Sequence, residues 1–277
     1  MKFESFINQM ILNNKKRIQT FPSKEKCELF INHLKDLLFV SDIVNNPTAG
    51  ELERNIELLE KDLKNLVLSI IKDEQKAIEH STDFFAALPS IYNLSITDAE
   101  AILNSDPAAR NLEEVMIAYP GFFATLVYRF SHQLFKQGLH TLARFFTEYA
   151  HSKTGIDIHP GASIGHSLAI DNGTGIVIGE TSKIGNNVKI YQGVTLGALN
   201  VSKENATIKR HPTVEDSVVI YAGATILGGS TVIGEGCIIG GNVWITYSVP
   251  ANSIAYHKSE IHIKDNNPFP EPINFII

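Results

Sequence analysis

Residues 175–197 read GIVIGETSKIGNNVKIYQGVTLG, and their aliphatic residues recur at every sixth position, at Ile178, Ile184, Ile190 and Leu196. Neither an α-helix, with about 3.6 residues per turn, nor an alternating strand, with about 2.0, repeats in this way. A period of six is typical of a short strand followed by a turn, and three such units make one triangular coil with the aliphatic side chains inside. The stretch therefore predicts a parallel β-helix.

The same period extends in both directions from this stretch. Aliphatic residues upstream and downstream have the same spacing, and a tryptophan ends the series. These residues are Ile158, Ile164, Ile170, Val214, Ile220, Ile226, Val232, Ile238 and Trp244. Since coils of about 18 residues stack about 4.8 Å apart, residues one coil apart along the chain become neighbours. We predict a β-helix domain over residues 154–255, with these side chains pointing inward.

Two irregularities interrupt the repeat. The step from Ile170 to Ile178 takes eight residues, across DNGTGIV. Residues 197–213, GALNVSKENATIKRHPT, lack the pattern and are predicted to leave the coil as a loop. This loop carries a cluster of basic residues, Lys203, Lys209, Arg210 and His211. In an acidic chain such a cluster predicts a contact with an anion, the alternative being a solvated, flexible loop.

The chain before the repeat has helical spacing. Apolar residues alternate four and three apart, at Leu52, Ile56, Leu59, Leu63, Leu66 and Ile70. This spacing predicts one long amphipathic helix. Pro89, Pro107 and the Pro120–Gly121 pair are expected to divide the next part of the chain into shorter helices, and a last one over residues 139–151 ends near Gly155. Residues 1–153 are therefore predicted to form an all-helical domain.

Composition excludes several classes of protein. The 277 residues include 24 Lys and Arg against 30 Asp and Glu, a formal net charge of −6. This balance argues against a nucleic-acid platform, whose affinity comes from neutralising phosphates. Cys27 and Cys237 are the only cysteines, which argues against a disulfide framework and a thiolate zinc site. No apolar run is long enough to span a bilayer, so we expect a cytoplasmic protein without membrane or nucleic-acid partners.

Several motifs resemble a known family when they are taken in order. They are Asp157-Ile158-His159-Pro160, TGIVIGET at 174–181, GVTLG at 193–197 and Arg210-His211-Pro212, preceded in the helical half by Asp106-Pro107-Ala108, Gly121-Phe122, Tyr128-Arg129 and His132. Over roughly residues 106–255 the chain resembles the serine O-acetyltransferases. The resemblance implies a left-handed β-helix that forms a trimer or a dimer of trimers. It also implies acetyl transfer from acetyl-CoA, bound between neighbouring β-helices, to the L-serine hydroxyl for cysteine biosynthesis, with L-cysteine as feedback inhibitor.

The resemblance also implies roles for individual residues. Asp157 matches the carboxylate that orients the catalytic base, and Asp106 and Asp171 match those that hold the serine ammonium group. Arg210 and His211 match the pair that faces the substrate carboxylate and the reaction centre. Glu180 matches a further active-site position. Five small residues match positions near coenzyme A, namely Gly197, Ala198, Ala222, Gly223 and Gly240. For the small residues, tight corners of the coil are the alternative explanation.

One position departs from the family pattern. Where the family carries its catalytic histidine, this chain has Asn172. A carboxamide cannot accept the serine proton near neutral pH, and losing a positioned base typically removes about 10² to 10⁴ in rate. We therefore expect an impaired acetyltransferase. His211 is the best substitute base, and His159 and His166 rank below it.

The end of the chain suggests a partner. Residues 256–277 are rich in proline and are predicted to be an extended tail, which ends at Ile276 and Ile277. Such a terminal isoleucine resembles the family peptide that inserts into cysteine synthase, the alternative being a tail packed on its own β-helix. Asn172 favours a second hypothesis, a weakly catalytic scaffold that binds the synthase through Ile277.

A third hypothesis, a zinc lyase on the same fold, needs three imidazoles that converge on one point. The candidates, His159, His166 and His211, have no recognisable ligand spacing. We therefore expect no metal site.

Overall fold

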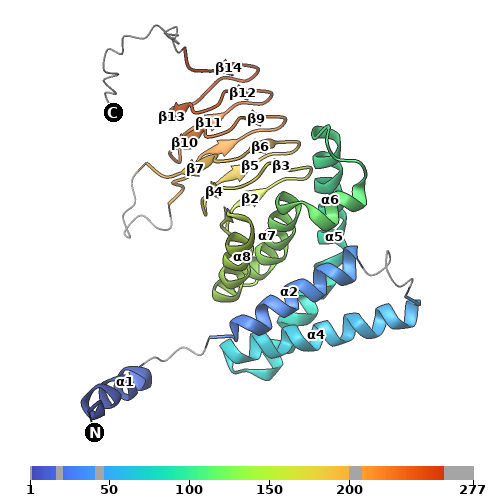
Figure 1. Cartoon of the computed structure of the whole chain (residues 1–277), viewed down its shortest axis with the longest axis vertical. Coiled ribbons are helices and arrows are strands. Elements are labelled where there is room, and N and C mark those ends of the chain that lie inside the picture. Colours follow the sequence, from blue (N-terminus) through green and yellow to red (C-terminus); the bar gives the residue numbers. More distant parts are fainter. Residues whose placement is uncertain (1, 17–20, 41–46, 200–207, 259–277) are drawn as a thin grey trace, which may run out of the picture.

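The computed structural model describes residues 2–16, 21–40, 47–199 and 208–258, in which helices come first and short parallel strands come after them (Figure 1). The helices are α1 (Glu4–Lys16), α2 (Lys24–Phe39), α4 (Ala49–Ile71), α5 (Glu74–Ser105), α6 (Leu112–Ala118), α7 (Pro120–Lys136) and α8 (His140–Thr154). A helical half followed by a parallel β-helix is thus confirmed. None of the described helices is both long and apolar enough to cross a membrane.

Local sequence signals set several helix ends. Thr48 caps α4, since its Oγ1 accepts from the N–H of Glu51 while Glu51 accepts from the N–H of Thr48. Pro120 begins α7, where its missing N–H costs no intrahelical hydrogen bond. Gly155 ends α8 in the left-handed conformation, with φ of 70°.

The predicted helix break at Pro89 is wrong. Helix α5 continues through this residue, and the break before α5 lies at Lys72 and Asp73 instead. A proline inside a helix removes one backbone hydrogen bond and costs about 3 kcal/mol. Leu88 and Ile91 next to it are buried, and their packing offsets that cost.

The β-helix consists of three parallel sheets. Sheet 1 contains β1 (Ile156–Ile158), β4 (Ile176–Ile178), β7 (Thr195–Gly197), β10 (Thr225–Leu227) and β13 (Trp244–Ile245). Sheet 2 contains β2 (Ser163–Ile164), β5 (Lys183–Ile184), β8 (Thr213–Val214) and β11 (Val232–Ile233). Sheet 3 contains β3 (Ala169–Asp171), β6 (Lys189–Tyr191), β9 (Val219–Ile220), β12 (Ile238–Ile239) and β14 (Ile254–Ala255).

The repeat keeps its predicted phase only as far as Ile226. The inward residues of the later strands are Ile233, Ile239 and Ile245, each buried, whereas the predicted ones, Val232, Ile238 and Trp244, face outward. Trp244 is 64% exposed. The turn at Gly228 and Gly229 holds one extra residue, with Gly228 at φ of 104°, and this shifts the phase by one.

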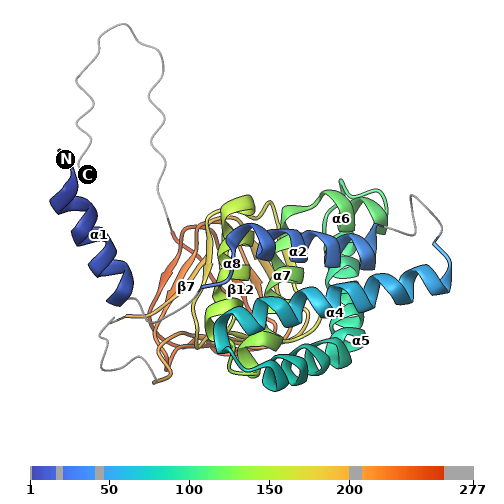
Figure 2. The ribbon, with the colours of Figure 1, turned by 90° about the horizontal axis from the view of Figure 1, so that it is seen from below.

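The helices lie at the end of the β-helix where the chain enters it. Figures 1 and 2 show α7 and α8 next to the first strands, with α2 and α4 farther away. Aromatic side chains fill the helical core, among them Phe30, Phe84, Phe130 and Phe146. A separate core of aliphatic side chains runs along the inside of the β-helix.

Candidate active site

The predicted site residues fall on two corners of the triangular coil. The asparagine corner joins sheet 3 to sheet 1 and consists of residues 172–175, 192–194, 221–224 and 240–243. The histidine corner joins sheet 1 to sheet 2 and consists of residues 159–162, 179–182 and 208–212. A three-residue strand of sheet 1 separates them in each coil, so they lie on the order of 10 Å apart.

Two predicted carboxylates meet at the asparagine corner. Asp106 follows α5, and its oxygens accept from the N–H of Ala108 and the hydroxyl of Tyr119, both at 2.8 Å. These two hydrogen bonds lower the pKa of Asp106. The bond between Tyr119 and Asp106 also raises the pKa of Tyr119 to about 12. Asp171 ends β3, and its Oδ2 lies 3.0 Å from Nζ of Lys189. The fold thus brings Asp106 and Asp171 to one place from distant parts of the chain.

Lys189 and Tyr119 belong to this cluster, although the sequence analysis missed them. Nζ of Lys189 also donates to the carbonyl oxygen of Ser105 at 2.8 Å. The sequence carried no signal for Lys189, because the two extra residues after Ile170 lengthen this coil, so that Asp171 is aligned with Tyr191 and Lys189 with Ala169. Tyr119 had no signal either, since only the packing of α6 and α7 brings it to Asp106.

Asn172 is exposed and has a left-handed backbone, with φ of 49°. It lies in the corner that holds the two extra residues. Gly173 anchors this corner to the core, because a Cβ atom there would come within 2.4 Å of Cγ2 of Ile170. Asparagine and histidine both tolerate the left-handed region, so the backbone at position 172 suits either residue. No hydrogen bond joins the Asn172 side chain to Asp157 in the described part of the chain.

His211 is the buried residue of the histidine corner, with 8% of its surface exposed. Its ring lies against Gly179, where a Cβ atom would come within 2.0 Å of Cδ2 of the imidazole. Nδ1 of His211 accepts from the N–H of Thr181 at 3.1 Å, and Oγ1 of Thr181 lies 2.9 Å from the same nitrogen. Glycine at position 179 is thus required for the imidazole to occupy this place.

The Thr181 contacts fix the tautomer of His211. Oγ1 of Thr181 accepts from the N–H groups of Arg210, at 2.9 Å, and His211, at 3.0 Å, so its own proton is directed at Nδ1. The neutral ring therefore carries its proton on Nε2 and offers a donor there. Burial and the adjacent Arg210 and Lys209 cations lower the pKa of His211 to about 4.

Arg210 and Glu180 form an ion pair beside His211. Partial burial acts to raise the pKa of the Glu180 carboxyl, but the ion pair with Arg210 has the larger effect and lowers that pKa. His159 lies nearby; its Nδ1 accepts from the N–H of Gly161 at 3.0 Å, and burial lowers its pKa. A pocket of about 500 Å³ opens next to this group, lined in part by Phe135, His140, Arg144, His159 and Glu180.

Asp157 pairs with a residue that sequence reasoning missed. Nη1 of Arg144, on α8, lies 3.2 Å from Oδ1 of Asp157, and Nη2 lies 2.5 Å from Glu148. Ligand atoms of Glu148, His151 and Asp157 lie within 4.8 Å of one another, as a metal site requires. The Arg144 guanidinium contacts both carboxylates, so the group already has an internal cation.

The histidines proposed for a zinc site do not converge. His166 is exposed at the corner between sheets 2 and 3, with Nδ1 3.0 Å from Oγ of Ser167, whereas His159 and His211 lie at the histidine corner. Lys203 and the tail that ends in Ile276 and Ile277 lie outside the described residues.

The predicted coenzyme A positions are divided between the two corners. Gly197 and Ala198 lie at the end of β7, on the side of the histidine corner, and Ala222, Gly223 and Gly240 lie at the asparagine corner. Gly223 has φ of 72°, which favours glycine on conformational grounds. At Gly197 a Cβ atom would come within 2.7 Å of the Leu227 side chain. Both glycines thus have a structural reason to be present.

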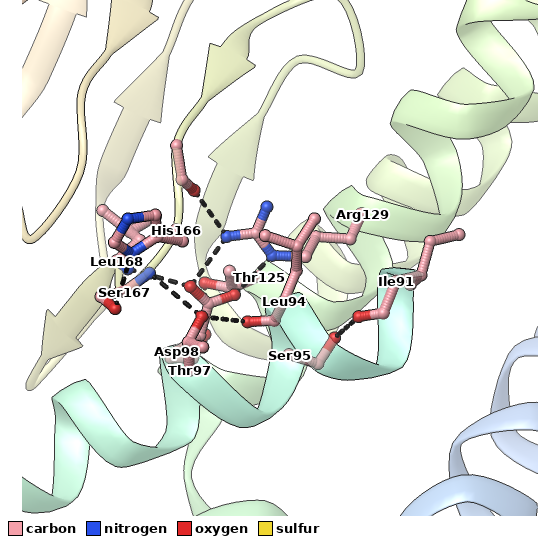
Figure 3. Close-up of polar contacts among 12 residues, drawn as sticks. Ile91, Leu94, Ser95, Thr97, Asp98, Thr125, Arg129, His166, Ser167 and Leu168 are labelled. Atoms are coloured by element: carbon pink, nitrogen blue, oxygen red, sulfur yellow. Dashed lines mark hydrogen bonds and ion pairs between the residues drawn. The ribbon is translucent and has the colours of Figure 1, made fainter. Parts of the chain in front are cut away.

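A buried ion pair joins the helices to the first coil (Figure 3). Arg129 on α7 holds Asp98 on α5 through two hydrogen bonds, and its Nη2 donates to the carbonyl of Gly165 at 2.8 Å. Asp98 also accepts from the N–H of Leu168 at 2.9 Å, directly before β3. These bonds fix the end of α5 against β3, and therefore Asp106 against Asp171.

Comparisons with known proteins agree with this arrangement, although no protein-family model matches the chain. It is 42% identical over 271 residues to a plasmid-encoded serine acetyltransferase of Synechococcus elongatus, covering 89% of this chain and 84% of the relative. Serine acetyltransferase isoform 3 of Entamoeba histolytica, solved with cysteine, has a TM-score of 0.76 at 36% identity, covering 86% of this chain and 85% of that one. The serine acetyltransferase of Neisseria gonorrhoeae, solved with serine, has a TM-score of 0.58 at 28% identity. This match covers 81% of this chain and 93% of the Neisseria chain.

Fold, corners and relatives together define a β-helix acyltransferase. Within that class, the chain belongs to the serine acetyltransferase family. The predicted family and the left-handed β-helix are thereby confirmed.

Proposed function

We propose that this chain transfers the acetyl group of acetyl-CoA to the hydroxyl of L-serine, giving O-acetylserine and free coenzyme A. One observation carries the proposal: the fold presents two matching halves of an amino-acid site. Asp106 and Asp171 suit an ammonium group, and Arg210 with His211 suits a carboxylate. Membership of the family supports the same reaction.

The two halves stand at different corners, so one serine cannot reach both in a single chain. We infer that the asparagine corner of one copy faces the histidine corner of the next, in a trimer or a dimer of trimers. Coenzyme A then lies in the groove between the copies, along Gly197 and Ala198 on one side and Ala222, Gly223 and Gly240 on the other. The division of these positions between the corners supports this arrangement.

The reaction forms a bond from the serine oxygen to the acetyl carbon and breaks the carbon–sulfur bond, while a base takes the hydroxyl proton. Asn172 cannot serve as that base. His211 is a poor substitute, because Thr181 holds its Nδ1 as an acceptor and leaves a proton on Nε2. His211 instead donates a hydrogen bond to the substrate carboxylate or to the developing oxyanion. We therefore expect a slow enzyme.

Serine-dependent release of the coenzyme A thiol tests this function. Asn172→His should raise the rate by about 10² to 10⁴, since it restores a positioned base. Asn172→Gln keeps a carboxamide and is the matched control, with no expected gain. A histidine variant that releases no thiol in response to serine would contradict the proposed activity.

Cysteine is the proposed feedback inhibitor. It has the same ammonium and carboxylate groups as serine, so the same two halves can hold it. Solved relatives whose names record bound cysteine support this proposal. Cysteine should raise the apparent KM for serine without changing kcat, and a pattern with unchanged KM would place cysteine elsewhere.

Asn172 also favours a second function, a scaffold for cysteine synthase that binds through Ile277. Removing Ile276 and Ile277 should abolish binding to the synthase while leaving thiol release unchanged. Undiminished binding would exclude the tail as the contact.

A further inference from the structure

The asparagine corner contains a cation as well as its two carboxylates. Lys189 lies on β6 with 16% of its side chain exposed. Its ammonium group contacts Oδ2 of Asp171, the carbonyl of Ser105 and the face of Tyr191, whose ring centre is 4.6 Å away. Tyr191 in turn stacks on Tyr221 at 5.0 Å. The lysine is therefore held on several sides.

These contacts connect the two halves of the molecule at the ammonium site. Ser105 is the last residue of α5, and Asp106 follows it directly. A single side chain from the second coil thus reaches the C-terminal end of α5 and Asp171 of the first coil. Lys189 thus ties Asp171 to the residue directly before Asp106.

The charges of this cluster determine what it can hold. The carboxylates of Asp106 and Asp171 contribute −2 and Lys189 contributes +1, so a net charge of −1 remains. Oδ1 of Asp171 has no hydrogen-bond partner among the residues that the structure describes. One further ammonium group therefore finds both an acceptor and a charge to neutralise.

We propose that Lys189 is a positioning residue of the substrate site, which supplies the internal counter-charge for the two carboxylates and leaves room for one ammonium group. This inference rests on the proposed function, in which Asp106 and Asp171 bind the amino acid. Without Lys189, the repulsion between the two carboxylates has no internal counter-ion, so one of them takes up a proton at a higher pH. Serine binding then fails on acidification, because a protonated carboxyl attracts an ammonium group weakly.

Other charged and titratable groups face the cluster. They are Tyr119 from the start of α7, Tyr191 from β6 and Glu114 from α6. The negative charge of Glu114 helps to raise the pKa of Tyr119. Tyr119 stays neutral below pH 10, because Asp106 raises its pKa to about 12. Partial burial acts to lower the pKa of Lys189, but the contacts with Tyr191 and Asp171 have the larger effect and raise that pKa. Tyr119 and Lys189 therefore keep their charge between pH 5 and pH 8, so a loss of binding at the acid end of this range in a variant reports its carboxylates.

The test is calorimetric titration of the full chain with L-serine between pH 5 and pH 8. For the unaltered chain and Lys189→Arg, we expect an affinity that changes little with pH. For Lys189→Met, we expect unchanged or tighter binding at pH 8, since a competing cation is gone. The same variant should bind about twofold more weakly at pH 5 than at pH 8, since a shift of about one pH unit brings the carboxyl titration close to pH 5.

A merely structural lysine predicts another result, namely weaker binding of Lys189→Met by the same factor at every pH. That result, or an unchanged affinity profile, would overturn the proposal. If the unaltered chain binds no serine, the proposed function fails, and NMR titration of ¹³C-labelled aspartate carboxyls still decides the role of Lys189. An upward shift of the Asp106 titration in Lys189→Met supports it, and an unchanged titration refutes it.

Discussion

The backbone N–H of Thr181 and Nδ1 of His211 lie 3.1 Å apart, and this hydrogen bond determines which nitrogen of the imidazole carries the proton. Oγ1 of the same threonine accepts from the N–H groups of Arg210 and His211, which precede β8. One side chain thus ties the end of the loop to the second coil and leaves the neutral His211 ring with its donor at Nε2. A histidine fixed in this way suits recognition of an anion better than removal of a proton.

Acid should destabilise the protein in part through His211. Its pKa is about 4 in the folded chain against an ordinary 6.5, so the unfolded chain binds the proton first as the pH falls. The free energy of unfolding should therefore decrease from about pH 6.5 towards pH 4. Urea unfolding at pH 7 and pH 5 measures this decrease, which should be smaller in His211→Gln. An equal decrease in both chains would show that His211 is already protonated or not buried.

Thr181→Val should weaken the histidine corner. The substitution leaves the N–H groups of Arg210 and His211 without their acceptor, which costs about 1–3 kcal/mol when such groups are buried. Urea unfolding gives the loss of stability, and Thr181→Ser, which keeps the hydroxyl, should behave like the unaltered chain. Equal stability of all three chains would mean that water replaces the threonine without loss.

Gly179→Ala should displace the imidazole of His211, because the new Cβ would lie within 2.0 Å of Cδ2. Overpacking of this kind costs about 1–3 kcal/mol, and serine affinity should fall with it. Gly50→Ala is the matched control, since nothing lies within 4 Å of its Cβ position in α4. The control should leave serine binding unchanged, and calorimetry on both variants checks the expectation.

A histidine at position 172 should introduce a new pH dependence. The left-handed backbone there accepts histidine, and an exposed imidazole titrates near pH 6.5, to within about one unit. Thiol release by Asn172→His should therefore fall as the pH drops below this value, because the protonated ring cannot accept a proton. The unaltered chain should lack this decline, and the same decline in both would point to another base.

Breaking the buried pair of Asp98 and Arg129 should destabilise the molecule strongly. Asp98→Asn leaves the guanidinium without its counter-charge, and removing one partner of a buried pair costs about 3–5 kcal/mol. Asp98→Leu combined with Arg129→Met should recover much of this stability, as apolar replacement of a whole pair often does. Urea unfolding of the single and double variants tests both statements, and additive losses would contradict them.

Sequence periodicity was sufficient for the fold, because each six-residue unit directs its aliphatic side chain inward independently of the rest of the chain. The period failed after Ile226, where a single extra residue at Gly228–Gly229 moved the inward positions to Ile233, Ile239 and Ile245. Val, Ile and Trp are β-formers on either face of a strand, so composition alone could not reveal the shift. Pro89 was misjudged for a related reason, since packing overrode a local signal.

The sequence by itself determined the β-helix, its corners and the chemical types of the site residues, because these depend on local spacing and on side-chain chemistry. Only the tertiary structure decided which groups meet. Lys189 at Asp171, Arg144 at Asp157 and Thr181 at His211 are contacts between segments that are separate in the chain. The charge and the proton position of a site depend on such contacts, and their geometry exists only after the coils have stacked.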